Sequence, residues 1–283
     1  MKTLLYTALA MFAFAANSIL CRMALGTSSI DAAAFTSIRL VSGVVVLASI
    51  LLFTGRQVSQ KSRGSWMGDL MLFLYAITFS YAYLSLDTGT GALILFGSVQ
   101  VTMIFVSVVM GYRPSAMEWG GLLLAFAGFV YLVLPGVTAP PLGGFSLMLM
   151  AGIAWGFYSL NGRQSVNPLM DTGYNFLRTL PYVVLLLLFT YSSSAMTMQG
   201  VILAMVSGGV ASGIGYAIWY RALRGLTSTV AAVVQLSVPL IAALGGILLL
   251  SESLTLRFVI AAILILSGIL IVIYGRQSFQ EPV

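Results

Sequence analysis

The strongest structural signal in the chain is the stretch LRFVIAAILILSGILIVIY at residues 256–274, in which Arg257 is the only charged residue. A helix that crosses a bilayer needs about 20 mostly apolar residues, so this stretch predicts a transmembrane helix. A second stretch, WGGLLLAFAGFVYLVL at residues 119–134, has the same apolar character near the middle of the chain.

The composition extends this prediction to the whole chain. Of its 283 residues, 60% are hydrophobic and 7% are charged, whereas about a quarter are charged in an ordinary soluble domain. So little charge cannot cover the surface of a soluble protein of this size. We therefore predict an all-α membrane protein with ten transmembrane helices. The apolar blocks are Thr3–Cys21, Ala32–Phe53, Ser65–Leu84, Gly91–Met110, Trp119–Leu134, Gly144–Leu160, Thr172–Phe189, Gly200–Trp219, Val230–Leu250 and Leu256–Tyr274.

The two halves of the sequence resemble each other at an offset near 140. LAFAGFV at residues 124–130 is matched by LILSGIL at 264–270, and Asp31 and Arg39 are matched by Asp171 and Arg178. Each half holds five blocks, an odd number, so the halves must cross the membrane in opposite directions. We therefore predict two inverted five-helix repeats, residues 1–138 and 139–283. Inverted repeats are typical of transporters whose substrate site lies near the midplane.

The basic residues predict the orientation of the chain. With the N-terminus inside, nine face the cytoplasm and two the other side, in line with the positive-inside rule. Both termini are then cytoplasmic. The nine are Lys2, Arg56, Lys61, Arg63, Arg113, Arg163, Arg221, Arg224 and Arg276, and the two are Arg22 and Arg257.

Several function classes are excluded by the residues that are missing. Histidine is absent and Cys21 is the single cysteine, so we expect no metal site, no cofactor and no internal disulfide. No catalytic residues are expected, because paired acids on one side are lacking: Asp87 and Asp171 fall on opposite sides, where each is expected to cap a helix. The excess of positive charge is explained by membrane orientation rather than by nucleic acid.

Polar and aromatic side chains at depth are the candidates for substrate binding. Amides cost several kcal/mol in hydrocarbon unless they are bonded, so they should face the protein interior. Hydrogen bonding between helices explains them equally well, and Trp219 also fits a membrane interface. The candidates are Asn17, Tyr81, Gln100, Trp155, Tyr158, Trp219 and Gln235.

Two arginines and two prolines are candidates for gating or structural roles. Arg39 and Arg178 are the only charges well inside the predicted spans. We expect each to bond to backbone carbonyls or to an Asp, and the alternative is a gate or an anchor for a substrate carboxylate. Pro181 and Pro239 interrupt apolar blocks and could act as hinges. No Asp or Glu lies near the centre of a block, so we expect transport to need no carboxylate there.

The chain resembles the EamA-type repeat family of the drug/metabolite transporter superfamily. The resemblance rests on Gly111–Gly128 and Ser251–Gly268, which look like the helix–short loop–helix ending of that repeat. Glu252 stands where many members carry Glu, whereas Tyr112 stands at that place in the first half. Ala16-Asn17-Ser18 and Ala154-Trp155-Gly156 stand where relatives often have a Trp-Gly-Ser-like stretch.

This resemblance implies a carrier of the bacterial inner membrane that works as a monomer by alternating access. The chain also resembles an aromatic amino-acid exporter of the superfamily, and this resemblance implies outward transport of amino acids. A pocket of aromatics and amides also fits a small neutral or zwitterionic substrate with apolar character. The alternative is a drug or other small-metabolite exporter of the same superfamily. The partners are then the substrate and the lipid bilayer.

Overall fold

The computed structural model describes residues 2–53, 64–111, 113–134, 136, 139–162, 165, 167–190, 196–223, 225–226 and 234–278. These residues form helices and connections, with no strand among them. The helices are α1 (Lys2–Gly26), α2 (Ala32–Phe53), α3 (Trp66–Ala82), α4 (Thr88–Val109), α5 (Ala116–Val133), α6 (Leu142–Gly162), α7 (Pro168–Arg178), α8 (Leu180–Thr190), α9 (Met198–Val206), the π-helix η1 (Ser207–Ile214), α10 (Gly215–Leu223), α12 (Val238–Leu250) and α13 (Leu256–Ser278).

Within the described residues, eight helical stretches are long and apolar enough to cross a membrane. Two of them join neighbouring elements, α7 with α8 and α9 with η1 and part of α10. The two remaining apolar blocks appear as shorter helices: α3 has 17 residues and α12 has 13. The predicted block Val230–Leu250 begins outside the described residues, which resume at residue 234.

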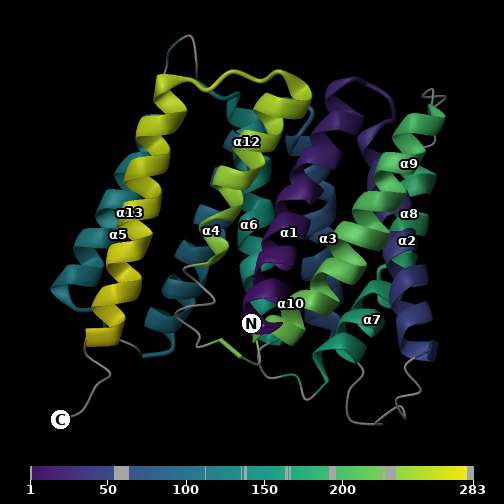
Figure 1. Ribbon diagram of the computed structural model, residues 1–283, viewed down its shortest axis with the longest axis horizontal. Helices are drawn as coiled ribbons and strands as arrows, with labels where there is room; N and C mark the ends of the chain where they lie inside the picture. The colour runs from purple at the N-terminus through teal and green to yellow at the C-terminus, as the bar shows by residue number, and fades with distance from the viewer. Residues whose placement is uncertain are drawn as a thin grey trace.

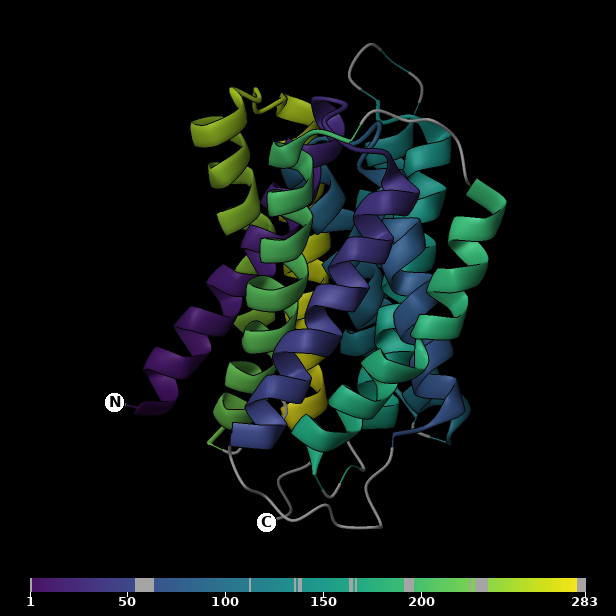
Figure 2. The ribbon, with the colours of Figure 1, turned by 90° about the vertical axis from the view of Figure 1, so that its right-hand side faces the viewer.

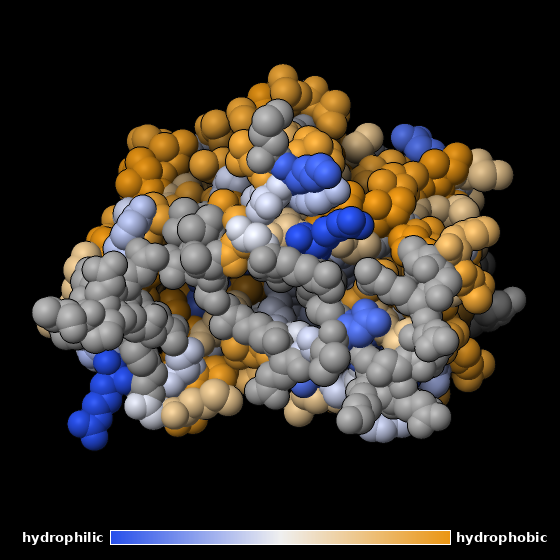
Figure 3. All heavy atoms as spheres, turned by 60° about the horizontal axis from the view of Figure 1, so that its bottom comes forward, coloured by the Kyte–Doolittle hydropathy of each residue, from blue (hydrophilic) through white to orange (hydrophobic). Residues whose placement is uncertain are grey.

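The helices form an upright bundle (Figures 1 and 2). α5 and α13 pack together at one edge, α2, α8 and α9 lie at the other, and α1 runs through the middle (Figure 1). α1 begins and α13 ends at the same end of the bundle, which we call the lower end after its place in Figure 1. Figure 3 shows hydrophobic side chains around the bundle and hydrophilic ones on its lower end. Large apolar side chains exposed on the flanks, such as Phe53, Phe189 and Leu248, suit contact with lipid.

Helix breaks occur in the second half of the chain. α7 and α8 are separated by Thr179, whose hydroxyl donates to the carbonyl of Phe176 at 2.6 Å. Pro181 lies in the first turn of α8 and lacks the N–H that would continue the helix across this point. Pro239 lies in the first turn of α12, directly after a turn at Leu236–Ser237. Both prolines therefore mark helix starts rather than points inside a helix.

The contact between α5 and α13 depends on glycine. A Cβ atom at Gly121 would lie 2.6 Å from the carbonyl oxygen of Gly268, and one at Gly268 would lie 2.6 Å from the carbonyl oxygen of Gly121. The two backbones therefore touch directly, as small residues allow in membrane helices. Gly120 is adjacent in sequence, but a Cβ there would meet nothing within 4 Å.

This difference gives a matched pair of substitutions. We expect Gly121→Ala to lower the stability of the protein by about 1–3 kcal/mol, because the added methyl group forces two backbones apart. Gly120→Ala should leave stability unchanged or raise it by up to about 1 kcal/mol through helix propensity. Thermal unfolding of the purified protein in detergent checks both, and equal effects of the two variants would contradict the close contact.

Candidate functional site

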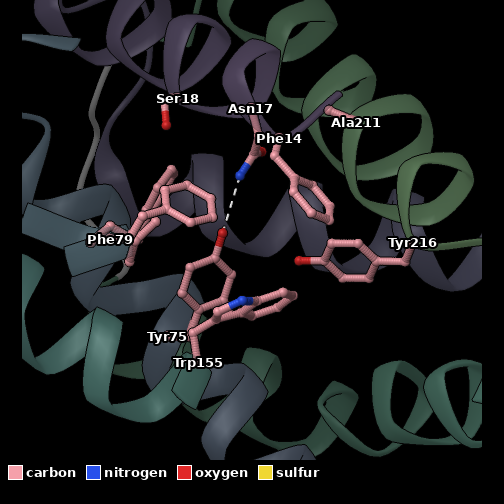
Figure 4. Close-up of a pocket in the computed structure, with 10 residues that line it drawn as sticks. Phe14, Asn17, Ser18, Tyr75, Phe79, Trp155, Ala211 and Tyr216 are labelled. Carbon is pink, nitrogen blue, oxygen red and sulfur yellow. Dashed lines mark hydrogen bonds between the residues drawn. The ribbon is translucent and has the colours of Figure 1, made fainter. Parts of the chain in front are cut away.

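A small chamber lies inside the bundle where α1, α3, α4, α6, η1 and α10 meet (Figure 4). Its volume is about 10 Å³, which is room for a single water molecule. The bundle is therefore closed around the chamber, and a larger molecule requires the helices to move apart. The lining residues are Phe14, Asn17, Ser18, Tyr75, Phe79, Leu95, Phe96, Trp155, Ala211 and Tyr216.

Helical spacing places these side chains on common faces. Phe14, Asn17 and Ser18 are three and four positions apart on α1, so they project from one side of that helix. Tyr75 and Phe79 are four apart on α3 and project together in the same way. Figure 4 shows the two sets facing each other across the chamber.

The Tyr75 hydroxyl is the centre of a buried polar network. It accepts a hydrogen bond from Asn17 Nδ2 at 3.1 Å and another from Arg39 at 2.9 Å. Ser207 Oγ donates to Asn17 Oδ1 at 2.6 Å. The network joins α1, α2, α3 and η1, and its π-helical member is of a type often found at functional sites. Without these bonds the buried polar groups would each carry a desolvation cost.

Aromatic rings form the rest of the wall. The Trp155 ring centroid lies 4.8 Å from that of Tyr75, 5.0 Å from Tyr216 and 5.2 Å from Tyr158. On the other side, Phe14 meets Tyr216 at 5.9 Å in an edge-to-face arrangement. These distances are typical of favourable ring pairs, so the chamber is shaped for flat or apolar groups.

A polar cluster joins helix ends at the upper end of the bundle, and we call it the upper cluster: Arg22, Tyr83, Asp87, Thr88 and Glu252. Arg22 at the end of α1 lies 3.4 Å from Glu252 and 3.6 Å from Asp87, and it donates to the Tyr83 carbonyl at 3.0 Å. Glu252 also accepts from the Thr88 backbone N–H at 2.9 Å and from the Thr88 hydroxyl at 3.0 Å. Glu252 thus holds the first turn of α4 to the α12–α13 connection.

A second group joins helix ends at the lower end of the bundle, and we call it the lower cluster: Gly64, Ser65, Asn161, Asp171 and Asn175. The backbone N–H of Gly64 donates to Asp171 at 2.9 Å, and that of Ser65 donates to Asn175 at 3.0 Å. Asn161 donates to the Ser65 hydroxyl. The start of α3 is therefore bound to α6 and α7.

The candidates from sequence fall into two groups. Asn17 and Trp155 line the chamber. Tyr158 and Trp219 stand behind it: the Tyr158 ring lies tilted against Trp155 at 5.2 Å, and the Trp219 ring meets Phe14 edge-to-face at 5.8 Å.

The remaining candidates are placed elsewhere. Gln100 is buried on α4 and Tyr81 is half-buried on α3, and neither is among the residues that line the chamber. Gln235 is half-buried just before α12. Arg178 ends α7 with its guanidinium 5.0 Å from the Trp66 ring centroid, close to the lower cluster.

Tyr75, Phe79, Phe14 and Tyr216 also line the chamber but were not among the site residues predicted from the sequence. The four-residue spacing of Tyr75 and Phe79 on one apolar block was an available signal. The depth of an aromatic within a block, however, does not tell a lipid-facing ring from a chamber-facing one.

Two expected contacts differ in the structure. Arg39 was expected to bond to backbone carbonyls or to an Asp, but it bonds to the Tyr75 hydroxyl because α3 brings a phenol to it first. Asp87 stands at the N-cap of α4 without a capping hydrogen bond, and Glu252 supplies that bond from another part of the chain. Asp171 binds Gly64, while Asn167 caps α7.

Several basic residues that predict the orientation, and Tyr112, are not among the described residues. Arg56, Lys61, Arg63, Tyr112, Arg163 and Arg224 lie outside the described residues. Among the residues that are described, no group of three His, Cys, Asp or Glu side chains could hold a metal ion.

Removal of the Tyr75 hydroxyl tests the polar network. We expect Tyr75→Phe to lower stability by about 1–3 kcal/mol, since Asn17 and Arg39 both lose a buried partner. Tyr182→Phe on α8 is the matched control, because the Tyr182 hydroxyl has no hydrogen-bond partner among the described residues. Thermal unfolding of both variants is the measurement. A loss in Tyr75→Phe no greater than in the control would rule out the network as a stabilising element.

Glu252 predicts a pH dependence of the upper cluster. Burial raises the pKa of its carboxyl above the ordinary value, and the hydrogen bonds from Thr88 oppose that rise only in part. When the cluster opens to water the pKa returns toward its ordinary value, so protonation favours the closed form. The closed form should therefore gain population as pH falls through the raised pKa, and lose it as pH rises.

Double electron–electron resonance measures this change as the distance between two spin labels. The labels are attached to the cysteines of Thr27→Cys and Ser253→Cys in a Cys21→Ala background. The short distance should grow in population on acidification, and Glu252→Gln should make the distribution independent of pH. A shift toward the long distance at acidic pH would contradict the claim that protonation of Glu252 favours the closed form.

Known proteins resemble the chain over most of its length. The EamA-like transporter family matches residues 142–274. The uncharacterized protein PA1977 of Pseudomonas aeruginosa is 50% identical over 97% of this chain and 96% of its own length. The uncharacterized transporter YoaV of Bacillus subtilis is 22% identical over 87% of this chain and 89% of its own.

Further likenesses extend to other organisms and to a solved structure. An uncharacterized transporter of Archaeoglobus fulgidus is 26% identical over 79% of this chain and 83% of its own length. A protein of known crystal structure shares the fold, with a TM-score of 0.64 at 18% identity over 94% of this chain and 98% of that one. The chain belongs to the EamA-like transporter family, within the drug/metabolite transporter superfamily.

Proposed function

We propose that the protein is a carrier that moves amino acids, above all aromatic and other apolar ones, out of the cell by alternating access. The observation that carries this proposal is the closed aromatic chamber with an amide and hydroxyls in its wall. Rings offer an apolar side chain flat surfaces, and the amide and hydroxyls offer hydrogen bonds to polar groups. The motifs around Asn17, Trp155 and Glu252 resemble those of the EamA-type family, and the substrate class and outward direction follow from the proposed likeness of the chain to the aromatic amino-acid exporter YddG of the same superfamily.

In this proposal the chain crosses the membrane ten times as two inverted repeats, residues 1–138 and 139–283. The family match over residues 142–274 supports the division, since it spans the second of these repeats. The glycine contact between α5 and α13, the last helices of the two halves, supports it as well. The substrate site then lies where the halves meet, as in other inverted-repeat carriers.

The two clusters support alternating access because each joins one half of the chain to the other. The upper cluster binds Arg22 and Thr88 of the first half to Glu252 of the second. The lower cluster binds Gly64 and Ser65 of the first half to Asp171 and Asn175 of the second. Opening either end therefore requires the halves to separate at that end while the other cluster holds them together.

The proposed orientation has both termini in the cytoplasm of a bacterial cell. Lys2 begins α1 and Arg221 lies in the last turn of α10, and both helix ends are at the lower end of the bundle (Figure 1). Arg22 and Arg257 belong to the opposite end, close to the upper cluster and to the start of α13. Under the positive-inside rule the lower end is cytoplasmic. We propose in addition that the protein lies in the inner membrane and works as a monomer.

Flux through liposomes that contain the purified protein tests the proposal. Labelled phenylalanine or tryptophan should enter by a saturable process that other apolar amino acids inhibit. Trp155→Ala should reduce this flux by about tenfold, because substrate rings lose their stacking partner. Trp119→Ala is the control, since the Trp119 side chain is 51% exposed on the outside of α5.

Two results would contradict the proposal. Linear, unselective leak would indicate a channel. Absence of flux across a panel of amino acids, together with saturable flux of another small metabolite, would favour the alternative exporter of the same superfamily. Comparison of flux with and without a proton gradient shows in addition how transport is driven.

A further inference from the structure

Arg39 is a buried charge without a carboxylate partner. It lies on α2 with a relative exposure of 2%. Its guanidinium donates to the Tyr75 hydroxyl at 2.9 Å and lies 5.0 Å and 4.9 Å from the ring centroids of Tyr75 and Phe79. Both rings line the chamber. The positive charge therefore stands at the edge of the chamber.

Every acidic side chain in the described part of the chain is engaged elsewhere. Asp87 and Glu252 pair with Arg22, and Asp171 accepts from Gly64. The other three accept from their own helix termini: Asp31 from Ala34 at 2.8 Å, Asp69 from Leu70 at 2.7 Å and Glu118 from Ser115 at 3.0 Å. Burial of an uncompensated charge is costly, and inside a membrane such a residue marks a functional site by default.

One nitrogen of the guanidinium is free to bind. Arg39 Nη1 is buried and has no hydrogen-bond partner among the described residues. The neighbouring rings stabilise the cation through their faces but cannot accept the N–H bonds of the fork. A guanidinium in this state is matched to a carboxylate, whose oxygens accept from it in a fixed geometry.

We infer that Arg39 binds the carboxylate of the transported molecule. This inference rests on the proposed function and narrows its substrate class. The residues that line the chamber include no Asp or Glu, so the wall offers no counter-ion to an ammonium group. The site therefore requires a carboxylate and an apolar or aromatic body, and it does not require the α-amino group. Aromatic monocarboxylates bind as well as the amino acids of the same shape.

Three ligands with one phenyl ring separate these requirements. Phenylalanine carries both charged groups, 3-phenylpropanoate only the carboxylate, and 2-phenylethylamine only the ammonium. Binding to the purified wild-type protein is measured by thermal stabilisation, which follows mass action. We expect phenylalanine and 3-phenylpropanoate to bind with similar affinity, and 2-phenylethylamine to bind about 10- to 100-fold more weakly, the worth of a hydrogen-bonded charge.

Substitution of the arginine assigns the effect to one residue. Arg39→Gln should weaken the two carboxylates by about 10- to 100-fold and leave the amine unchanged. Arg39→Lys keeps the positive charge but loses the paired N–H donors of the guanidinium. It should therefore bind the carboxylates more tightly than Arg39→Gln and more weakly than wild type. Arg113→Gln is the control for removal of a positive charge, because Arg113 is exposed in the connection before α5. If Arg39→Gln does not fold, the comparison of ligands on the unaltered chain decides.

The binding of a carboxylate by Arg39, which we call the anchor, and the transport of amino acids can fail independently of each other. If 2-phenylethylamine binds as tightly as phenylalanine, or if Arg39→Gln binds 3-phenylpropanoate as tightly as wild type, the anchor is overturned. If 3-phenylpropanoate binds and depends on Arg39 while phenylalanine is neither bound nor carried, the anchor stands and the proposed amino-acid function fails. If neither carboxylate binds to the wild-type protein, both proposals are overturned.

Discussion

The hydroxyl of Tyr75 is the contact on which the interior of this protein depends. In an apolar bundle each buried polar group must find a partner, and here one phenol oxygen accepts from both Asn17 and Arg39. Ser207 extends the network to η1. Four segments from both halves of the chain are thereby held at one point beside the chamber. The closed shape of the chamber follows from this convergence and from the ring contacts around it.

Few charged side chains take part in the contacts at the two ends of the bundle. Described ion pairs occur at the upper cluster, where Arg22 meets Asp87 and Glu252, whereas the lower cluster uses an Asp, an Asn and backbone N–H groups. Each cluster makes only a few contacts, and each joins the two halves of the chain. Contacts of this size can be broken and remade at modest cost, as a carrier needs. The interior charge of Arg39, by contrast, has no such partner and is left for a ligand.

Much of the fold could be predicted from sequence because length and apolarity determine it directly. The apolar blocks predicted the helices, and the similarity of residues 124–130 to 264–270 predicted the internal repeat. That the two helices with these segments, α5 and α13, pack against each other was not predicted. The π-helix η1 and the break at Thr179 could not be predicted, since they depend on packing against other helices. The turn at Leu236–Ser237, directly before α12, was also not predicted.

Prediction of the site was partial for a related reason. Asn17 and Trp155, which line the chamber, could be proposed from the sequence because an amide and an indole at depth are unusual in hydrocarbon. Tyr75 was not predicted as a site residue because tyrosine is also common at membrane interfaces. The partner of Arg39 depended on which helix lies opposite it, and one sequence does not contain that information.

A crystal structure of the protein with 3-phenylpropanoate bound shows whether Arg39 holds the carboxylate of a ligand. We expect the ligand to lie in an enlarged chamber, with its carboxylate within hydrogen-bond distance of Arg39 Nη1 and its ring against Trp155. A ligand bound away from the chamber, for example in the apolar groove between α2 and α9, with Arg39 still on Tyr75 alone, would contradict it.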